Sequence, residues 1–280
     1  IILNNMKEII QALQKEMKEQ ASTFNGDTIP KLSLEDIDRT LTLFKKALFP
    51  GVFHVIEQHD LETFLESILY KLKFNLLTTL EKFNQKNPTN HAQKIIETLP
   101  NLKRELKKDI TAIFNGDPAA QTHEEVILAY PSFEAIMIYR IAHELTLLDL
   151  DLFARMCASI AHRKTGIDIH PKACIGHSFC IDHGTAIVIG ETSIIGNNVK
   201  LYQGVTIGAL SVSKKQKNKK RHPTIEDNVT IYARTTILGG NTTIGENSII
   251  GGNVWLTSSV PKNSKIYNKE FNIEHTQPNH

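Results

Sequence analysis

The chain has 280 residues, of which 41% are hydrophobic and 22% are charged, and its formal net charge is +2. This is the composition of a soluble globular protein, and so small a net charge gives no indication of nucleic-acid binding. No stretch approaches the roughly 20 uninterrupted apolar residues that a membrane-spanning helix needs. A membrane protein is therefore not expected.

The first ten residues, IILNNMKEII, lack the basic start and the long apolar run of a secretory signal peptide. The cysteines, Cys157, Cys174 and Cys180, form an odd and sparse set, which favours reduced thiols. We therefore expect a cytoplasmic protein in which all three cysteines are small core residues.

Helical spacing of apolar residues marks the first part of the chain. Between residues 61 and 72 the apolar positions follow the pattern of one helix face: Leu61, Phe64, Leu65, Ile68, Leu69 and Leu72. Ser33 precedes Asp36 by three residues, a variant of the capping box at the start of LEDIDRTLTLFKKAL. Further helices are expected at about 3–21, 91–114, 132–148 and 150–163, and this part of the chain is punctuated by Pro50, Pro100, Pro118 and Pro131. We predict an all-helical domain over residues 1–165.

After Gly166 the aliphatic residues recur every six positions. The series starts with Ile169, Ile175, Ile181 and Ile187, slips by two, and continues through Ile189, Ile195, Leu201 and Ile207. Beyond a polar interruption it resumes with Ile225, Ile231 and Ile237, slips by one, and ends with Ile244, Ile250 and Leu256. Neither a strand nor a helix has this period, whereas a solenoid with three hexapeptides in each coil of about eighteen residues does. We predict a left-handed parallel β-helix of about four to five coils over residues 166–262, and an α+β chain in two parts. A β-sandwich would not keep this register through so many units.

The interruption, ALSVSKKQKNKKRHP at residues 209–223, contains basic residues and no acid. Such a run is typical of an extended, solvated loop. Its end, Arg221-His222-Pro223, re-enters the coil, so we expect these side chains to be held against the solenoid wall. Residues 263–280 then form a C-terminal tail.

Several local motifs resemble those of the serine acetyltransferases. In the solenoid they are IDIHPKACIG (167–176), IDHGTAIVIGET (181–192), LYQGVTIGA (201–209), KRHPTI (220–225) and TTILGG (235–240). In the helical part they are NGDPAA (115–120) and YPSFEAIMIYRIAH (130–143). The resemblance implies a metal-free enzyme that transfers the acetyl group of acetyl-CoA to the hydroxyl of L-serine, which gives O-acetyl-L-serine in cysteine biosynthesis.

A serine hydroxyl must lose its proton as it attacks a thioester, and histidine is suited to accept that proton. On the family pattern His183 is the general base, and Asp168 holds its imidazole in a dyad. Asp168 lies fifteen residues before His183, close to one coil, so it can sit beside His183 on the adjacent coil. The family implies direct transfer without an acyl-enzyme, so Cys174 and Cys180 are not expected to be nucleophiles. His170 and His177 are interpreted as structural and surface histidines.

Serine is a zwitterion, so its site needs a cation and anions. The family pattern assigns Arg221 to the carboxylate, because its planar fork matches that group, and His222 to the carboxylate or the developing oxyanion. Asp117 and Asp182 match the ammonium-binding carboxylates, and Asp117 is expected to reach the solenoid from the helical part. Glu191 also matches the family pattern and is expected to have a supporting role in the serine site.

Acetyl-CoA is expected in a groove between two solenoids, because the family forms trimers, often paired into hexamers. The family positions along its pantetheine arm match Ala209, Ala233, Gly239 and Gly251. Lysines of the 209–223 loop could attract its phosphates. By the same resemblance, L-cysteine is a possible feedback inhibitor that competes with serine at Asp117, Asp182 and Arg221.

The C-terminus departs from the family pattern. Many members end in an isoleucine that docks into O-acetylserine sulfhydrylase, whereas this chain ends in TQPNH, after KIYNKEFNIEH in place of the usual small residues. The sequence therefore argues against a complex with that enzyme.

Three other functions stay open from the residues alone. Another hexapeptide acyltransferase, acting on a sugar or an amine, would not require Asp117 or the Arg221-His222 pair. A metal-dependent hydratase would stack histidines about eighteen residues apart, but Val188, Ile195 and Leu201 stand at those positions after His170, His177 and His183. A non-catalytic oligomerisation scaffold would not need charged motifs inside regular coils.

Overall fold

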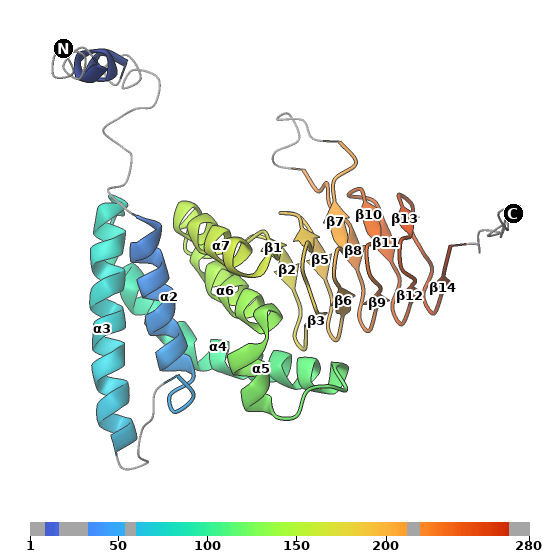
Figure 1. Cartoon of the computed structure of the whole chain (residues 1–280), viewed down its shortest axis with the longest axis horizontal. Helices are drawn as coiled ribbons and strands as arrows, with labels where there is room; N and C mark the ends of the chain where they lie inside the picture. Colours follow the sequence, from blue (N-terminus) through green and yellow to red (C-terminus); the bar gives the residue numbers. More distant parts are fainter. Residues whose placement is uncertain (1–8, 17–32, 54–59, 212–218, 269–280) are drawn as a thin grey trace, which may run out of the picture.

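The computed structural model describes residues 9–16, 33–53, 60–211 and 219–268. A bundle of helices precedes a parallel β-solenoid of about five turns (Figure 1), so the predicted fold class is confirmed. The tail residues 269–280, on which the expectation about the sulfhydrylase rests, lie outside the described residues, as do Lys214, Lys215 and Lys217 of the loop.

Residues 9–16 are helical, in part of the segment predicted at 3–21. The other helices are α2 (Leu34–Leu48), α3 (Leu61–Lys82), α4 (Pro88–Gly116), α5 (His123–Ala129), α6 (Pro131–Thr146) and α7 (Asp151–Thr165). The capping box that begins α2 is confirmed, because Ser33 and Asp36 exchange two hydrogen bonds of 3.2 Å. Among the described parts of the chain, no helix has both the length and the apolar character needed to cross a membrane.

Pro100 lies inside α4, so the helix predicted at about 91–114 runs through this proline. An internal proline costs a helix about 3 kcal/mol through the lost hydrogen bond and a steric clash. Pro100 is exposed, whereas Leu99, Leu102 and Leu106 are buried against the rest of the bundle. Burial of this face outweighs the local penalty, so the helix continues.

The solenoid strands form three parallel sheets. Sheet A contains β1 (Asp168–Ile169), β4 (Val188–Ile189), β7 (Thr206–Gly208), β10 (Thr236–Leu238) and β13 (Trp255–Leu256). Sheet B contains β2 (Cys174–Ile175), β5 (Ile194–Ile195), β8 (Thr224–Ile225) and β11 (Thr243–Ile244). Sheet C contains β3 (Cys180–Asp182), β6 (Lys200–Tyr202), β9 (Thr230–Ile231), β12 (Ile249–Ile250) and β14 (Lys265–Ile266). The chain therefore turns three corners in each coil, which we name AB, BC and CA after the sheets they join.

The aliphatic residue of each hexapeptide points into the solenoid, and those from Ile169 to Ile250 are all buried. The two-residue slip between Ile181 and Ile189 falls at one CA corner. There His183, Gly184 and Ala186 all have positive φ, at 59°, 92° and 64°. The two extra residues are accommodated at this corner, and the aliphatic residues before and after it, Ile181 and Ile189, are both buried.

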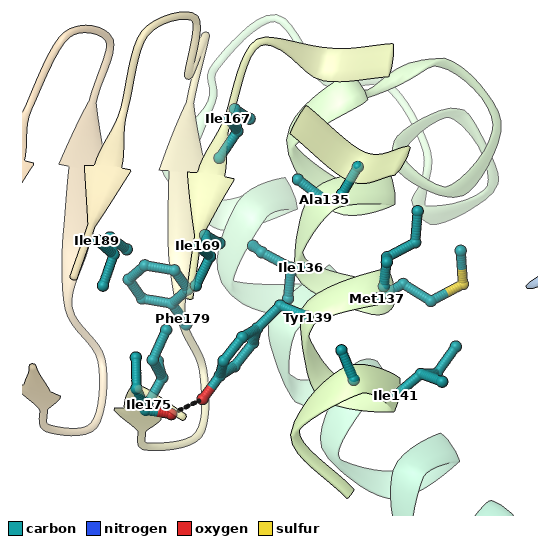
Figure 2. Packing of buried hydrophobic residues seen from close by; sticks show 14 of the residues in the cluster. Ala135, Ile136, Met137, Tyr139, Ile141, Ile167, Ile169, Ile175, Phe179 and Ile189 are labelled. Carbon is teal, nitrogen blue, oxygen red and sulfur yellow. Dashed lines mark hydrogen bonds between the residues drawn. The ribbon is translucent and has the colours of Figure 1, made fainter. Parts of the chain in front are cut away.

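The helical part is joined to the first coil by buried polar contacts. The Arg140 guanidinium binds both carboxylate oxygens of Asp109, at 2.7 and 2.9 Å, and donates to the carbonyls of Ile175 and Gly176. Tyr139 of α6 reaches towards the same coil (Figure 2), where its hydroxyl donates to the Ala173 carbonyl at 2.6 Å. Because each of these groups is buried and satisfied, α4 and α6 are held in one position relative to the solenoid.

The expectation that all three cysteines are core residues is wrong for one of them. Cys157 and Cys180 are buried, but Cys174 is exposed. Cys174 precedes the inward-facing Ile175 in β2, and alternate residues of a strand face opposite sides.

Candidate active site

The CA corner after β3 presents Asp182 and His183. His183 has a left-handed backbone, which is uncommon for a residue other than glycine, and its side chain is 73% exposed. The Asp182 side chain is only 13% exposed, and its Oδ1 lies 3.8 Å from His183 Nε2. An exposed imidazole beside a nearly buried carboxylate can accept a proton from a bound hydroxyl group.

Asp117 reaches this corner from the helical part, as the sequence predicts. It caps the C-terminus of α4, and it accepts hydrogen bonds from the Tyr130 hydroxyl at 2.7 Å and the Ala119 N–H at 2.8 Å. The Tyr130 hydrogen bond is the main reason that the pKa of Asp117 lies below its usual value, and Lys200 and His183 lower it further. The same bond raises the pKa of Tyr130 to about 12. Asp117 is thus an ionised carboxylate that can accept an ammonium group.

Lys200 joins these groups and was not anticipated from the sequence. Its Nζ lies 3.0 Å from Asp182 Oδ2 and donates to the Gly116 carbonyl at 2.6 Å. The register of β3 and β6 places Lys200 opposite Cys180, twenty residues apart. This coil has twenty residues because it contains the two-residue slip, so the sequence indicates the register but not the contacts of Lys200 with Asp182 and Gly116. We call Asp117, Tyr130, Asp182, His183 and Lys200 the carboxylate cluster.

Arg221, His222 and Glu191 form a second group at the AB corner, which we call the arginine cluster. Arg221 binds the Glu191 carboxylate, so these two predicted residues are brought together. His222 is buried, as expected for a side chain held against the solenoid wall, and it lies over Gly190. A Cβ on Gly190 would lie 2.0 Å from His222 Cδ2, so that position has room only for glycine.

His222 is held as a neutral imidazole. Its Nδ1 accepts the Thr192 N–H at 3.0 Å, which leaves Nε2 as the N–H donor. Burial is the main cause that lowers the pKa of His222, to about 4, and the positive charges of Arg221 and Lys220 act in the same direction. His222 can therefore donate a hydrogen bond to an anion without itself carrying a charge.

Asp168 lies at the start of sheet A, where it pairs with Val188 rather than with His183. Among the described residues, no hydrogen bond or ion pair joins Asp168 to His183, and the carboxylate within 4 Å of that imidazole is Asp182. His170 accepts the Lys172 N–H at its Nδ1, which is the contact of a histidine that caps a corner.

The two clusters lie at different corners of the same solenoid. The carboxylate cluster follows a strand of sheet C, whereas the arginine cluster follows strands of sheet A. Sheet A separates the two corners within one chain. Within one chain the two clusters are therefore separate groups of residues.

The four small residues expected beside acetyl-CoA also divide between two corners. Ala209 and Gly239 follow β7 and β10 at the AB corner, and the Gly239 N–H donates to the Gly208 carbonyl. Ala233 and Gly251 follow β9 and β12 at the CA corner. Of the loop lysines, Lys220 donates to the carbonyls of Thr192 in the preceding coil and of Pro223 at the end of the loop, so its ammonium ties the loop to the solenoid.

Comparisons with known proteins agree on one family. No protein-family model matches the chain. It is 51% identical over 179 residues to a plasmid serine acetyltransferase of Synechococcus elongatus, over 62% of this chain and 56% of that protein. The chain thus spans little more than half the length of that curated relative.

Two solved structures extend the similarity to most of the chain. Serine acetyltransferase isoform 3 of Entamoeba histolytica, in complex with cysteine, is 36% identical with a TM-score of 0.74, over 85% of this chain and 84% of that one. A serine acetyltransferase in complex with CoA is 29% identical with a TM-score of 0.55, over 84% of this chain and 96% of that one.

Proposed function

This chain belongs to the serine acetyltransferase family, and we propose that it transfers the acetyl group of acetyl-CoA to the hydroxyl of L-serine for cysteine biosynthesis. The observation that carries the proposal is the carboxylate cluster, in which Asp117 of the helical part and Asp182 of the solenoid lie beside His183. Two carboxylates fit the ammonium of serine, and the exposed imidazole beside Asp182 fits the proton transfer.

His183 is the general base of the proposed reaction. It takes the proton from the serine hydroxyl as the oxygen attacks the thioester carbonyl, and CoA leaves as the thiol. Transfer is direct, and the pKa of the Cys180 thiol, raised by burial to about 12, is unfavourable for an acyl-enzyme at this residue. Asp168 remains the predicted partner of the imidazole, and Asp182 is the second candidate because of its 3.8 Å approach.

Arg221 and His222 are proposed to bind the serine carboxylate and the developing oxyanion, with Glu191 holding Arg221 in place. Because these residues lie at a different corner from His183, we propose that they come from a neighbouring copy in a homotrimer or a dimer of trimers. Acetyl-CoA would then lie between two solenoids, next to Ala209 and Gly239 or next to Ala233 and Gly251.

Regulation and location are also proposals. The relatives in complex with cysteine and with CoA support L-cysteine as a feedback inhibitor and acetyl-CoA as the acyl donor. A cytoplasmic location remains a prediction from the sequence.

Release of free CoA thiol from acetyl-CoA tests the function. With L-serine, the parent should release thiol, and His183→Ala should lower the serine-dependent rate at least about a hundredfold. Replacement of His177, a histidine of the same solenoid outside both clusters, by Ala is the matched control and should keep the rate. A parent that acts on a sugar or an amine but not on serine would retain the fold and refute the substrate.

A further inference from the structure

Lys200 occupies the junction between the two parts of the chain. It lies in β6 of sheet C, and its side chain points away from the solenoid core, since Leu201 beside it is buried. Its Nζ contacts Asp182 Oδ2 at 3.0 Å and the Gly116 carbonyl at 2.6 Å, and it lies 4.5 Å from the centroid of the Tyr202 ring. One ammonium group therefore contacts the solenoid, the end of α4 and an aromatic face.

The end of α4 depends on this contact. The last carbonyls of a helix lack partners within the helix and carry partial negative charge, so a cation there is favourable. The last turn of α4 contains no basic residue of its own, and Lys200 supplies the cation from the solenoid. The approach is close, because a Cβ on Gly116 would lie 2.9 Å from Cys180 Sγ and 3.6 Å from Lys200 Nζ.

Asp117 follows Gly116 directly, so the position of this carboxylate is set by the seating of α4. Figure 1 shows α4 running beneath the first coils, and α4 and β3 are in contact. Lys200 also partly balances the two negative charges of Asp117 and Asp182, which would otherwise repel one another. Asp182 Oδ1, on the side of His183, is left to accept a ligand donor.

We propose that Lys200 is a positioning residue for L-serine, which ties the end of α4, and with it Asp117, to Asp182 beside His183. This inference rests on the proposed function. Lys200 is not assigned to the substrate itself, because its ammonium already contacts Asp182, Gly116 and the Tyr202 ring.

Steady-state kinetics of Lys200→Met test the proposal in the 280-residue chain. The KM for serine should rise about tenfold or more, while the KM for acetyl-CoA and the melting temperature stay close to those of the parent. Lys200→Arg keeps the charge and should recover most of the affinity for serine. The matched control is Lys265→Met, because Lys265 stands in the same register column of sheet C but is exposed.

A double-mutant cycle with Asp117→Asn adds a readout that a purely structural role would not give. If Lys200 acts through Asp117, the double variant should lose little more serine affinity than Asp117→Asn alone. The proposal is overturned if Lys200→Met leaves the KM for serine unchanged, or if it raises both KM values together with a loss of thermal stability. It is also overturned if the increases in the KM for serine caused by Lys200→Met and Asp117→Asn simply multiply in the double variant. A parent inactive with serine would instead overturn the proposed function, and this inference with it.

Discussion

Asp117 and Tyr130 show how a single hydrogen bond can set the protonation state of a candidate ligand group. The Tyr130 hydroxyl is the largest of the causes that lower the pKa of Asp117, ahead of the Ala119 N–H and the neighbouring charges. Tyr130 itself is placed by the start of α6, where it precedes Pro131 at the first helical position. The motif YPSFEA thus serves the geometry of the site as well as the beginning of a helix.

Replacement of Tyr130 by phenylalanine should therefore make serine binding more sensitive to acid. Without the hydroxyl, the pKa of Asp117 rises, so a larger fraction of the carboxylate is protonated at any given acidic pH and cannot bind ammonium. We expect the KM for serine to increase about threefold to tenfold. As the pH is lowered, the acid-dependent rise of this KM should begin at a higher pH than in the parent.

The measurement is the KM for serine as a function of pH, with acetyl-CoA saturating. Tyr70→Phe is the matched control, because Tyr70 is 74% exposed on α3 and far from the site in the chain. Identical pH dependence in the parent and in Tyr130→Phe would show that the hydrogen bond does not govern the charge on Asp117.

At the scale of the elements, the BC corner is built from a ladder of asparagines. Asn198, Asn228, Asn247 and Asn263 occupy equivalent positions, all with φ between 56° and 59°. Each side-chain amide donates to the next asparagine, at 3.1, 3.1 and 3.2 Å. Asparagine is suited to this corner because it tolerates the left-handed conformation and supplies both a donor and an acceptor.

The middle rungs of this ladder should contribute most to the stability of the solenoid. Asn228→Ala removes two side-chain hydrogen bonds and places alanine at a positive φ, which should cost about 1–2 kcal/mol. Asn228→Gly removes the same bonds but relieves the backbone, so it should fall between Ala and the parent. Asn263→Ala, at the end of the ladder, loses one bond and should destabilise less than Asn228→Ala. Thermal unfolding followed by circular dichroism gives the order, and equal melting temperatures for all variants would contradict it.

Periodicity explains why so much of the solenoid could be predicted. A six-residue repeat of buried aliphatic residues specifies the strands, and even the frame slip before Ile189 marks the corner that carries His183. Tertiary contacts have no such local signal. The two-residue slip sets the register that brings Lys200 next to β3, but no pattern in the sequence marks the contacts of its ammonium with Asp182 and the Gly116 carbonyl.

The predicted site residues illustrate the same limit. Motif resemblance indicated Asp117, Asp182 and His183 individually, and the structure brings these three together. It does not bring Asp168 into contact with His183. It also places Arg221 at another corner than His183. The corner at which a residue lies depends on how the three sheets fold into one coil, which a single motif does not reveal.

For the whole molecule, the separation of the two clusters by sheet A has a direct consequence. If one active site takes its carboxylate cluster from one copy and its arginine cluster from the next, then chains defective in different clusters should complement one another. His183→Ala and Arg221→Ala, each nearly inactive alone, should regain activity when both chains assemble together. In each cyclic trimer that contains both variants, one of the three sites should be intact, about one third of the total.

The experiment is co-expression of the two variants with different affinity tags, followed by tandem purification of the mixed assembly and the CoA-thiol assay. The pair Asp182→Ala and His183→Ala is the control, because both changes fall in the carboxylate cluster and no mixed site would be intact. Restoration in the first pair alone would place each site between two copies. Failure of the first pair, in an assembly shown to contain both chains, would mean that no active site combines the two clusters from different copies. In that event the proposal that Arg221 binds the serine carboxylate is wrong, while the proposed role of the carboxylate cluster in binding the ammonium group is unaffected.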